Sequence, residues 1–181
     1  MVVDRLPNFQ CAPSRADGRA GPTHSGTVHF ESHIEEIEQA YLDSRRGRPA
    51  SRPVIEMTIP SALDSTLAPP GYHIVQLFVQ YAPYDLDPSV GSWSDASFKQ
   101  RFVDRCLSIV EDYCPGFTSS IKHIDALSAL DLEQIFGLYK GNIHHGAISL
   151  HQLAYMRPAP GMSDTLTNIP VVVGGNCLFC S

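Results

Sequence analysis

The sequence lacks long apolar runs. Nowhere in its 181 residues is there an uninterrupted apolar stretch near the roughly 18 residues that a membrane-spanning helix needs. The first residues, Met1-Val2-Val3-Asp4, also lack the pattern of a secretory signal or an arginine-rich targeting segment. We therefore predict no membrane span. Because the chain opens as if it were already inside a strand, we expect its N-terminus to be a cut end. We also expect residues 1–9 and 171–181 to pack poorly or to borrow partners, because each should pair with elements absent from this chain.

Positive charge is scarce. Lysine and arginine number 13 against 19 aspartates and glutamates, and the formal net charge is -6. The one basic cluster, Arg45, Arg46, Arg48 and Arg52, has none of the interleaved aromatic residues that favour nucleic-acid binding. We therefore exclude nucleic acid as a partner. We interpret the cluster as a solvated helix end and loop, where arginines also suit the helix dipole.

The five cysteines are scattered and odd in number, so they do not form a disulfide framework. A reducing compartment fits this usage better. Cys177-x-x-Cys180 has the spacing of half a zinc site or of a redox pair, but no second pair completes four ligands. His144, His145 and His151 could complete it in principle, although no ligand spacing points there. We interpret the spacing as coincidence, with metal binding and redox chemistry as the alternatives, and we expect no metal site.

Nucleotide-binding signatures are absent as well. No Gly-x-Gly-x-x-Gly follows an expected strand, and no phosphate-binding loop occurs. Gly174-Gly175 follows an apolar run but has no helix behind it to offer an N-terminal dipole. No Ser/His/Asp or Cys/His set stands at a recognisable spacing. The residues alone leave the catalytic groups unknown.

Three segments have the pattern of helices. Residues 95–113 are the clearest, because apolar residues recur there at steps of three and four while charges occupy the other positions. Residues 32–35 (Ser-His-Ile-Glu) form a capping box that opens a helix ending near Gly47. A second capping box at residues 128–131 opens a short helix through Phe136.

Residues 73–81 give the strongest strand signal. Among the apolar residues from Ile74 to Val79 and their neighbours, only Gln76 and Gln80 are polar. We therefore expect both faces of this strand to be covered by other parts of the protein, as in a central strand. The mixed order of strands and helices predicts an α+β fold: a mixed, largely antiparallel sheet with helices packed on it. Further strand signals cover residues 2–9, 27–30, 54–59, 120–126 and 171–173.

Two features are candidates for a ligand site. Gln76 and Gln80 interrupt an apolar strand, and a buried amide finds its partners either in a ligand or, more often, in neighbouring backbone groups. His144 and His145 lie between glycines at residues 141–146. That loop either lines a ligand cavity or is a turn whose rings are exposed or hydrogen-bonded.

Eight short motifs in a fixed order carry a family resemblance. Together they resemble the C-terminal part of the pyridine nucleotide-disulfide oxidoreductase domain-containing protein 2 family, which is similar to phytoene desaturases and other FAD-dependent amine-oxidoreductase-like flavoproteins. Each motif is weak alone, but the series is specific and covers about residues 2–163. The motifs are residues 3–9, 52–57 with 60–61, 64 with 66–71, 78–84, 115–117, 131–133 with 136–138, 141–146 and 157–158.

The resemblance implies an FAD-binding Rossmann-type domain interleaved with a substrate domain whose sheet roofs the flavin. Residues 1–163 would be part of that substrate domain. Residues 164–181 would be a divergent or truncated tail, because the glycine-rich segment expected to return to the FAD domain finds no match there. The partner of this chain would then be the missing FAD-binding half of the parent protein, and mitochondrial residence is implied by the resemblance alone.

The function implied is that of a flavoprotein oxidoreductase acting on a small, largely apolar organic substrate, with FAD as the cofactor of the complete parent protein. Gln80, Tyr81, His144 and His145 are the candidate residues of the substrate cavity, by their positions in the motifs. We do not expect the chain alone to bind FAD or to be active. The alternative from another class is a non-catalytic α+β domain that acts through protein contacts.

Overall fold

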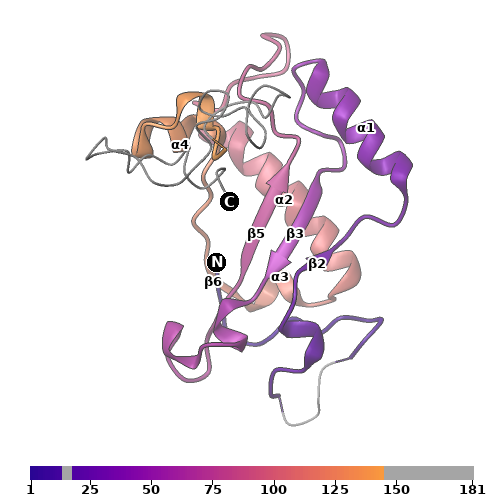
Figure 1. Cartoon of the computed structure of the whole chain (residues 1–181), viewed down its shortest axis with the longest axis vertical. Helices are drawn as coiled ribbons and strands as arrows, with labels where there is room; N and C mark the ends of the chain where they lie inside the picture. The colour runs from indigo at the N-terminus through magenta and orange to yellow at the C-terminus, as the bar shows by residue number, and fades with distance from the viewer. Residues whose placement is uncertain (14–17, 145–181) are drawn as a thin grey trace, which may run out of the picture. The chain divides into compact units, whose positions relative to one another are not determined.

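A computed structural model describes residues 1–13 and 18–144 of the chain. The chain divides into two units, residues 1–128 and 129–181, and each is described by itself. The first unit contains two three-stranded antiparallel sheets and three helices among its described residues (Figure 1). The α+β class and the antiparallel pairing are confirmed, with the strands divided between two sheets.

One sheet has the strand order β2-β3-β5, with β2 at Val28–His29, β3 at Val54–Thr58 and β5 at Gln76–Gln80. Ile55 pairs with Val79 and Met57 pairs with Leu77. Because side chains alternate along a strand, these four apolar residues share one face of the sheet. The strand predicted at residues 54–59 is confirmed, and it pairs with the second part of the segment at 73–81.

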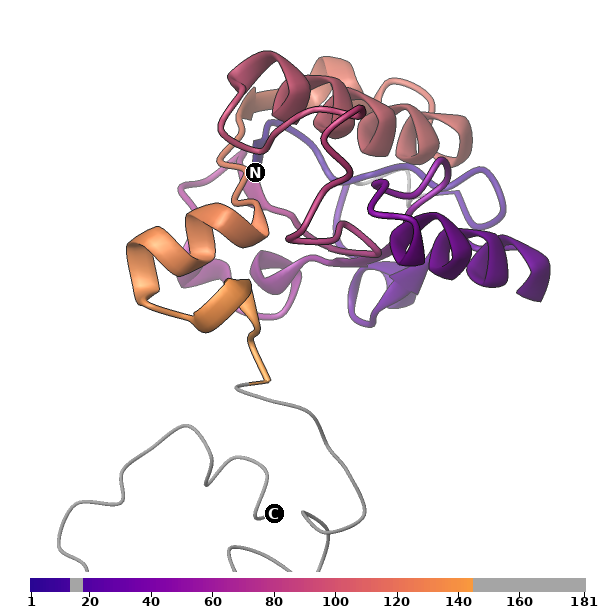
Figure 2. The same ribbon diagram turned by 90° about the horizontal axis from the view of Figure 1, so that it is seen from above.

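Helix α2 (Ala96–Tyr113) covers that apolar face. Its buried residues Cys106, Leu107, Ile109 and Val110 share one hydrophobic core with Ile55 and Met57. Figures 1 and 2 show α2 as a separate layer across β3 and β5. The helix begins where its N-cap Asp95 accepts a hydrogen bond from the Ser97 amide (2.8 Å), so the predicted helix is confirmed to within one residue.

The second sheet has the order β4-β1-β6, formed by His73–Ile74, Val2–Val3 and Ile121–His123. Strand β1 lies in its centre, and Val3 is fully buried. Phe9 also belongs to the main core. The expectation that residues 1–9 would pack poorly is therefore wrong, because both sides of β1 find partner strands within the described residues. The same expectation for residues 171–181 falls outside the described part.

The segment at residues 73–81 is not one strand. It breaks at Val75, which is fully buried and exchanges two hydrogen bonds with Met1: the Val75 amide donates to the Met1 carbonyl (3.0 Å), and the N-terminal amine of Met1 donates to the Val75 carbonyl (2.9 Å). Strand β5 is consequently an edge strand of its sheet in the described structure, and Gln76 is exposed. The prediction that both faces would be covered is wrong.

Helix α1 (Ile34–Arg45) starts differently from the predicted capping box. Its N-cap is His33, which makes no side-chain capping bond, and it is Glu36 whose carboxylate accepts a hydrogen bond from the Ser32 amide (3.0 Å). The helix buries Ala40 against Ala50 and Val54. Most of its apolar residues stay exposed, Ile34 at 76%.

The remaining helices are short. Helix α3 (Phe117–Ser120) follows α2 after a turn at residues 114–116. Helix α4 (Ala129–Phe136) belongs to the second unit and lies at the residues where the sequence predicted a short helix. In the part of the chain with a described structure, no helix combines the length and apolar character that crossing a bilayer requires. The domain boundary expected at residue 163 lies outside the described residues and stays a prediction. Short 3-10 turns lie at Pro22–His24, Pro60–Ala62, Ser65–Leu67 and Tyr139–Gly141.

Candidate functional site

The face of the β2-β3-β5 sheet that points away from α2 carries a set of mostly polar side chains, which we call the polar sheet face. Alternation along β3 and β5 sets these residues opposite to the core-facing Ile55 and Met57. At the centre of β5, Phe78 is 47% exposed, so a large aromatic ring is only half covered. We define the polar sheet face as Glu56, Thr58, Gln76, Phe78 and Gln80; Val54, which pairs with Gln80 on the same side, is buried against Ala40 of α1.

Gln80 and Glu56 form the closest contact on this face. The Gln80 amide donates from Nε2 to Glu56 Oε1 across the two strands at 2.5 Å. Thr58 and Gln76 face each other directly, and the Thr58 hydroxyl donates to Gln76 Oε1 at 3.4 Å. The partner of Gln80 is thus a side chain, rather than the backbone groups considered from the sequence. Among the described residues, the second carboxylate oxygen of Glu56 and the amide oxygen of Gln80 receive no hydrogen bond, so both are open to a ligand donor.

Tyr81 follows β5 directly and has an uncommon backbone conformation. Its φ of 63° places a bulky residue in the left-handed region, which costs roughly 1–3 kcal/mol unless surrounding contacts enforce it. Its carbonyl accepts a hydrogen bond from the Ala50 amide (3.0 Å), and its ring packs against Ala40, Ala50 and Val54. These contacts hold the strained residue at the end of the strand that carries Gln80. The structure therefore brings Gln80 and Tyr81 to one end of the sheet, as their adjacency in sequence requires.

The two candidate histidines belong to the second unit. His144 is exposed and its amide donates to the Asn142 side-chain oxygen (2.8 Å), a turn of the kind that asparagine favours. His145 lies outside the described residues. The turn interpretation fits His144, while a cavity role for His144 and His145 stays a prediction.

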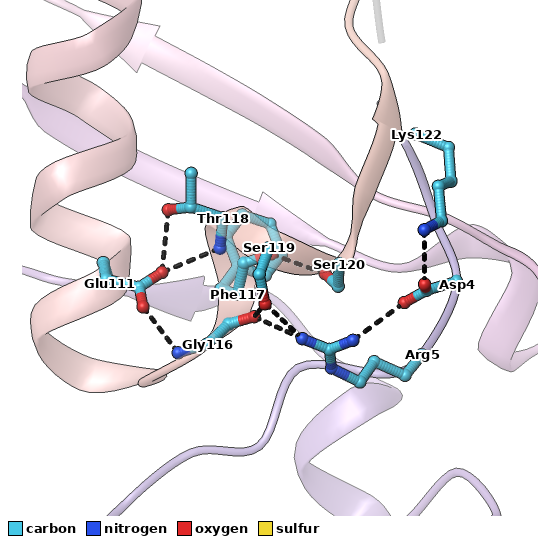
Figure 3. Close-up of polar contacts among 9 residues, drawn as sticks. All are labelled: Asp4, Arg5, Glu111, Gly116, Phe117, Thr118, Ser119, Ser120 and Lys122. Carbon is cyan, nitrogen blue, oxygen red and sulfur yellow. Dashed lines mark hydrogen bonds and ion pairs between the residues drawn. The ribbon is translucent and has the colours of Figure 1, made fainter.

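Two of the family-like motifs meet in space for structural reasons. Arg5, directly after β1, donates from Nη2 to the Gly116 carbonyl (2.7 Å) and to the Ser119 hydroxyl (2.5 Å), as Figure 3 shows. Its neighbour Asp4 pairs with Lys122 Nζ of β6 at 2.7 Å. The hydrogen bonds of Arg5 therefore connect the motif at residues 3–9, which follows β1, with the motif at residues 115–117, where α3 begins. These polar side chains form their hydrogen bonds and ion pairs with one another, so we assign them a role in stabilising the fold rather than in the candidate site.

The described cysteines do not provide a nucleophile in the core. Burial raises the pKa of the Cys106 thiol to about 12, and burial, with a smaller contribution from neighbouring Cys11, raises that of Cys114 to about 12. A thiol with such a pKa is not ionised near neutral pH. Within residues 1–13 and 18–144, no three His, Cys, Asp or Glu side chains gather closely enough to hold a metal ion. The Cys177-x-x-Cys180 pair lies outside that part.

A second surface was missed by the sequence interpretation. Arg48, Arg101 and Arg105 line an open groove of about 620 Å³ beside α2, which we call the arginine groove. The signal was present, because Arg101 and Arg105 are four residues apart and so fall on one face of the helix. The basic cluster read as a solvated helix end is divided: Arg48 lines this groove, whereas Arg52 donates to the Tyr113 hydroxyl (3.2 Å) and pairs with Glu36.

Comparison with known proteins shows what the chain is similar to. The chain is 45% identical over 165 residues to pyridine nucleotide-disulfide oxidoreductase domain-containing protein 2 of Rattus norvegicus, and 44% identical over 165 residues to the Mus musculus protein of the same name. Each match covers 91% of this chain. The family resemblance is confirmed.

The chain spans only 28% of the length of these two oxidoreductase-domain proteins. An uncharacterized protein of Mycobacterium tuberculosis is 24% identical over 159 residues, a stretch covering 82% of this chain and 29% of that protein. No family model and no solved structure matches the chain. The activity, substrates and partners of the whole protein therefore belong to the proposal below.

The described residues do not fit the pyrophosphate of a flavin dinucleotide. That group is held by a strand that leads through a glycine-rich turn into a helix N-terminus. The one strand of the β2-β3-β5 sheet that leads directly into a long helix is β2, and its connection to α1, residues 30–33, contains no glycine. A flavin of the parent protein would have to take its pyrophosphate contacts from other residues than these.

Proposed function

We propose that this chain is part of an FAD-dependent, phytoene desaturase-like oxidoreductase, in which the polar sheet face forms one wall of the substrate cavity. The family relationship supports the oxidoreductase assignment at the level of the relatives' name. The observation that carries the cavity assignment is the Gln80–Glu56 pair beside half-exposed Phe78, on a sheet face that α1 covers only in part. Such a face combines an apolar surface with a few polar groups in fixed positions, the usual composition of a small-molecule site.

Three residues of the face, and Tyr81 beside it, have distinct parts in this proposal. Phe78 offers the apolar surface against which a small, largely apolar substrate would lie. Gln80 and Glu56 hold each other in place and retain acceptor oxygens that would orient a polar end of the substrate. Tyr81, held in a strained conformation by its contacts with Ala50, fixes the end of β5 and so the position of Gln80. His144 and His145 remain separate candidates for substrate binding.

FAD in this proposal is held by the remainder of the parent protein. The flavin would supply the electron transfer, while this chain supplies binding and orientation of the substrate. The described residues contribute no pyrophosphate contacts, so we propose that the chain is inactive alone and that its partner is the FAD-binding half. Mitochondrial residence is proposed for the parent protein on the basis of the resemblance alone.

A chimera tests the proposal directly. Residues 1–163 of this chain replace the matching stretch of the rat relative, to which the chain is 45% identical over 165 residues. The purified chimera is assayed for bound flavin, for its visible spectrum, and for the rate at which its chemically reduced flavin is reoxidised. We expect bound FAD, and we expect Phe78→Ala and Gln80→Leu to alter the spectrum or the reoxidation rate without loss of folding.

The matched control is Gln100→Leu, an exposed glutamine on α2, which packs on the opposite face of the sheet. This change makes the same chemical replacement away from the proposed cavity and should leave both flavin readouts unaltered. If all three variants behave alike, the polar sheet face is not part of the cavity. If the chimera folds and holds no flavin, the assignment to an FAD enzyme is wrong.

The alternative, a non-catalytic domain acting through protein contacts, has one observation in its favour. Helix α1 leaves Ile34, Ile37 and Tyr41 exposed along one stripe at spacings of three and four. Singly exposed apolar residues are ordinary, but a stripe on one helix is a surface that a partner could cover. The same chimera separates the two functions, because Ile34→Ser with Ile37→Ser should leave the flavin readouts unchanged under the cavity proposal.

A further inference from the structure

The arginine groove lies on a different surface from the polar sheet face. It is formed between the loop after α1, which carries Arg48, and the first turns of α2, which carry Arg101 and Arg105. Its floor and walls include the half-buried rings of Phe98 and Phe102. The groove therefore combines three cationic side chains with two aromatic rings in an otherwise mixed lining, in a chain whose formal net charge is -6.

The guanidinium groups of the two arginines on α2 are held in place, and most of their N–H donors form no hydrogen bond within the described residues. Arg105 donates from Nη1 to the Ala50 carbonyl (2.9 Å), and its guanidinium lies 5.9 Å from the ring centre of Phe102. Arg101 donates from Nη1 to the Ser97 hydroxyl (3.1 Å), and its guanidinium lies 5.7 Å from the ring centre of Phe98. A guanidinium has five N–H donors, and each of these spends one in the described structure. The aromatic contacts orient the planar groups and leave the other donors for a ligand.

The carboxylates near the groove are already engaged. Asp43 also lines it, and its oxygens accept hydrogen bonds from the Ser51 amide (2.9 Å) and the Gln39 side chain (2.8 Å). Burial tends to raise the pKa of Asp43, but these hydrogen bonds outweigh it and hold the pKa below its ordinary value. Asp87 lies within electrostatic range of Arg48, and its Oδ1 accepts from the Ser89 amide and hydroxyl.

No carboxylate in the described part of the chain lies within the 4.0 Å of an ion pair with any of the three arginines. The lining charges are thus three cations and one carboxylate. An anion that enters the groove would meet a net positive rim, and it would compete with no internal ion pair for the guanidinium donors.

Two glycines fix the walls of the groove. Gly47 has a φ of +68°, and a Cβ there would lie 2.7 Å from the Asp87 backbone nitrogen, whose N–H donates to the Gly47 carbonyl (2.9 Å). Gly91 has a φ of +146°, and a Cβ there would lie 2.5 Å from the Phe98 ring. The loops at residues 43–51 and 85–91 are therefore pinned to each other and to α2. A preformed site loses less conformational entropy on binding.

We propose that the arginine groove binds a phosphate monoester that carries an apolar or aromatic group. Guanidinium groups match the geometry and charge of a phosphate dianion, which accepts several charge-assisted hydrogen bonds at once. The volume of about 620 Å³ suits an organic ligand rather than inorganic phosphate alone. Phe98 and Phe102 would contact the apolar group. The phosphate could belong to a soluble metabolite or to a lipid headgroup, which share this chemistry.

The experiment titrates the full 181-residue chain with phenyl phosphate by isothermal calorimetry at low salt. Inorganic phosphate and phenol are the two partial probes. We expect phenyl phosphate to bind more tightly than either, and added sodium chloride to weaken it because the arginines are exposed. Arg48→Gln and Arg101→Gln should each weaken binding about fivefold to tenfold, the usual scale for one charge-assisted contact at a solvated site. Neither side chain is needed to close the main core, so both variants should fold.

The control is Arg45→Gln, which removes the same charge from the end of α1 without altering the lining of the groove. It should bind phenyl phosphate as the unaltered chain does. Equal binding by all the variants, or binding of phenol as tight as that of phenyl phosphate, would overturn the proposal.

A second arm distinguishes the two sources of phosphate. Phosphatidylcholine vesicles with and without phosphatidic acid are sedimented with the chain and with the Arg48→Gln and Arg101→Gln variants. Binding of phosphatidic acid vesicles that the two substitutions abolish assigns the groove to a lipid headgroup. Binding of phenyl phosphate alone assigns it to a soluble phosphate ester. If neither phenyl phosphate nor the vesicles bind, the groove is not a phosphate site.

Discussion

Replacement of Glu111 by glutamine should destabilise the first unit at neutral pH. Glu111 lies near the end of α2 and accepts three hydrogen bonds: Oε1 from the Gly116 amide (2.5 Å), and Oε2 from the Thr118 amide and hydroxyl (2.7 Å each). Figure 3 shows both oxygens directed at the turn that begins α3. A glutamine side chain would present an NH₂ group to one of these donors, so at least one backbone amide would lose its acceptor.

The expected magnitude follows from these bonds. A hydrogen bond to a charged group contributes about 1.5–3 kcal/mol when it is well shielded, and a solvated one contributes less. Because Glu111 is only half buried, we expect Glu111→Gln to lower the free energy of unfolding by about 1–2 kcal/mol at pH 7. The chain has a single tryptophan, Trp93, which is buried in the same unit and reports its unfolding by urea through fluorescence.

The effect should depend on pH in a defined direction. Hydrogen bonds from the Thr118 amide, then from its hydroxyl and from the Gly116 amide, hold the pKa of Glu111 below its ordinary value of 4.5. The stabilisation is therefore complete above that value and is lost as the pH falls through the lower pKa of the folded state. The difference between the unaltered chain and Glu111→Gln should shrink when urea unfolding is repeated at acid pH.

Glu38→Gln on α1 is the control, because Glu38 is exposed and makes no hydrogen bond within the described residues. It should leave the urea midpoint nearly unchanged at both pH values. The reasoning about Glu111 is refuted if Glu111→Gln is as stable as the unaltered chain at pH 7, or if its deficit is the same at neutral and acid pH.

Three further predictions concern packing, thiol reactivity and cofactor binding. Gly91→Ala should reduce the free energy of unfolding by about 1–3 kcal/mol, because the added Cβ would collide with Phe98, and so lower the thermal midpoint followed by Trp93 fluorescence. The control Gly26→Ala has open space around its Cβ and should leave the midpoint nearly unchanged; equal midpoints for the two variants would contradict the packing. At pH 8, Ellman's reagent should react with exposed Cys11 but not with Cys106 or Cys114, whose thiols have pKa values near 12, until urea is added; rapid labelling of all three in the folded chain would contradict their burial. The isolated chain should retain no FAD after mixing with excess and desalting, since its described residues offer no strand, glycine-rich turn and helix for the pyrophosphate; a stoichiometric yellow protein would restore an autonomous flavoenzyme as the better interpretation.

The family resemblance could be recognised from the sequence because motif order is a property of the chain itself. The same holds for α2: its apolar spacing and Asp95 cap are local, and the helix lies within one residue of the predicted bounds. Strand β3 and helix α4 were predictable for the same reason. Gln80 and Tyr81 were named from motif position, but their surroundings were not foreseen. Nothing in the sequence indicated that Glu56 is the partner of Gln80, because that bond depends on the register between β3 and β5.

The sequence by itself determined the positions of α2, α4 and β3 and which family the chain resembles, because periodicity and capping act between residues a few positions apart. The tertiary structure decided which elements pair. Met1 takes the hydrogen bonds of Val75, so one apolar run becomes two strands in two sheets, and β5 becomes an edge strand. It also decided that Arg48 joins Arg101 and Arg105 in one groove, although more than fifty positions separate them. These arrangements depend on contacts between residues far apart in the chain, and local pattern carries no information about such contacts.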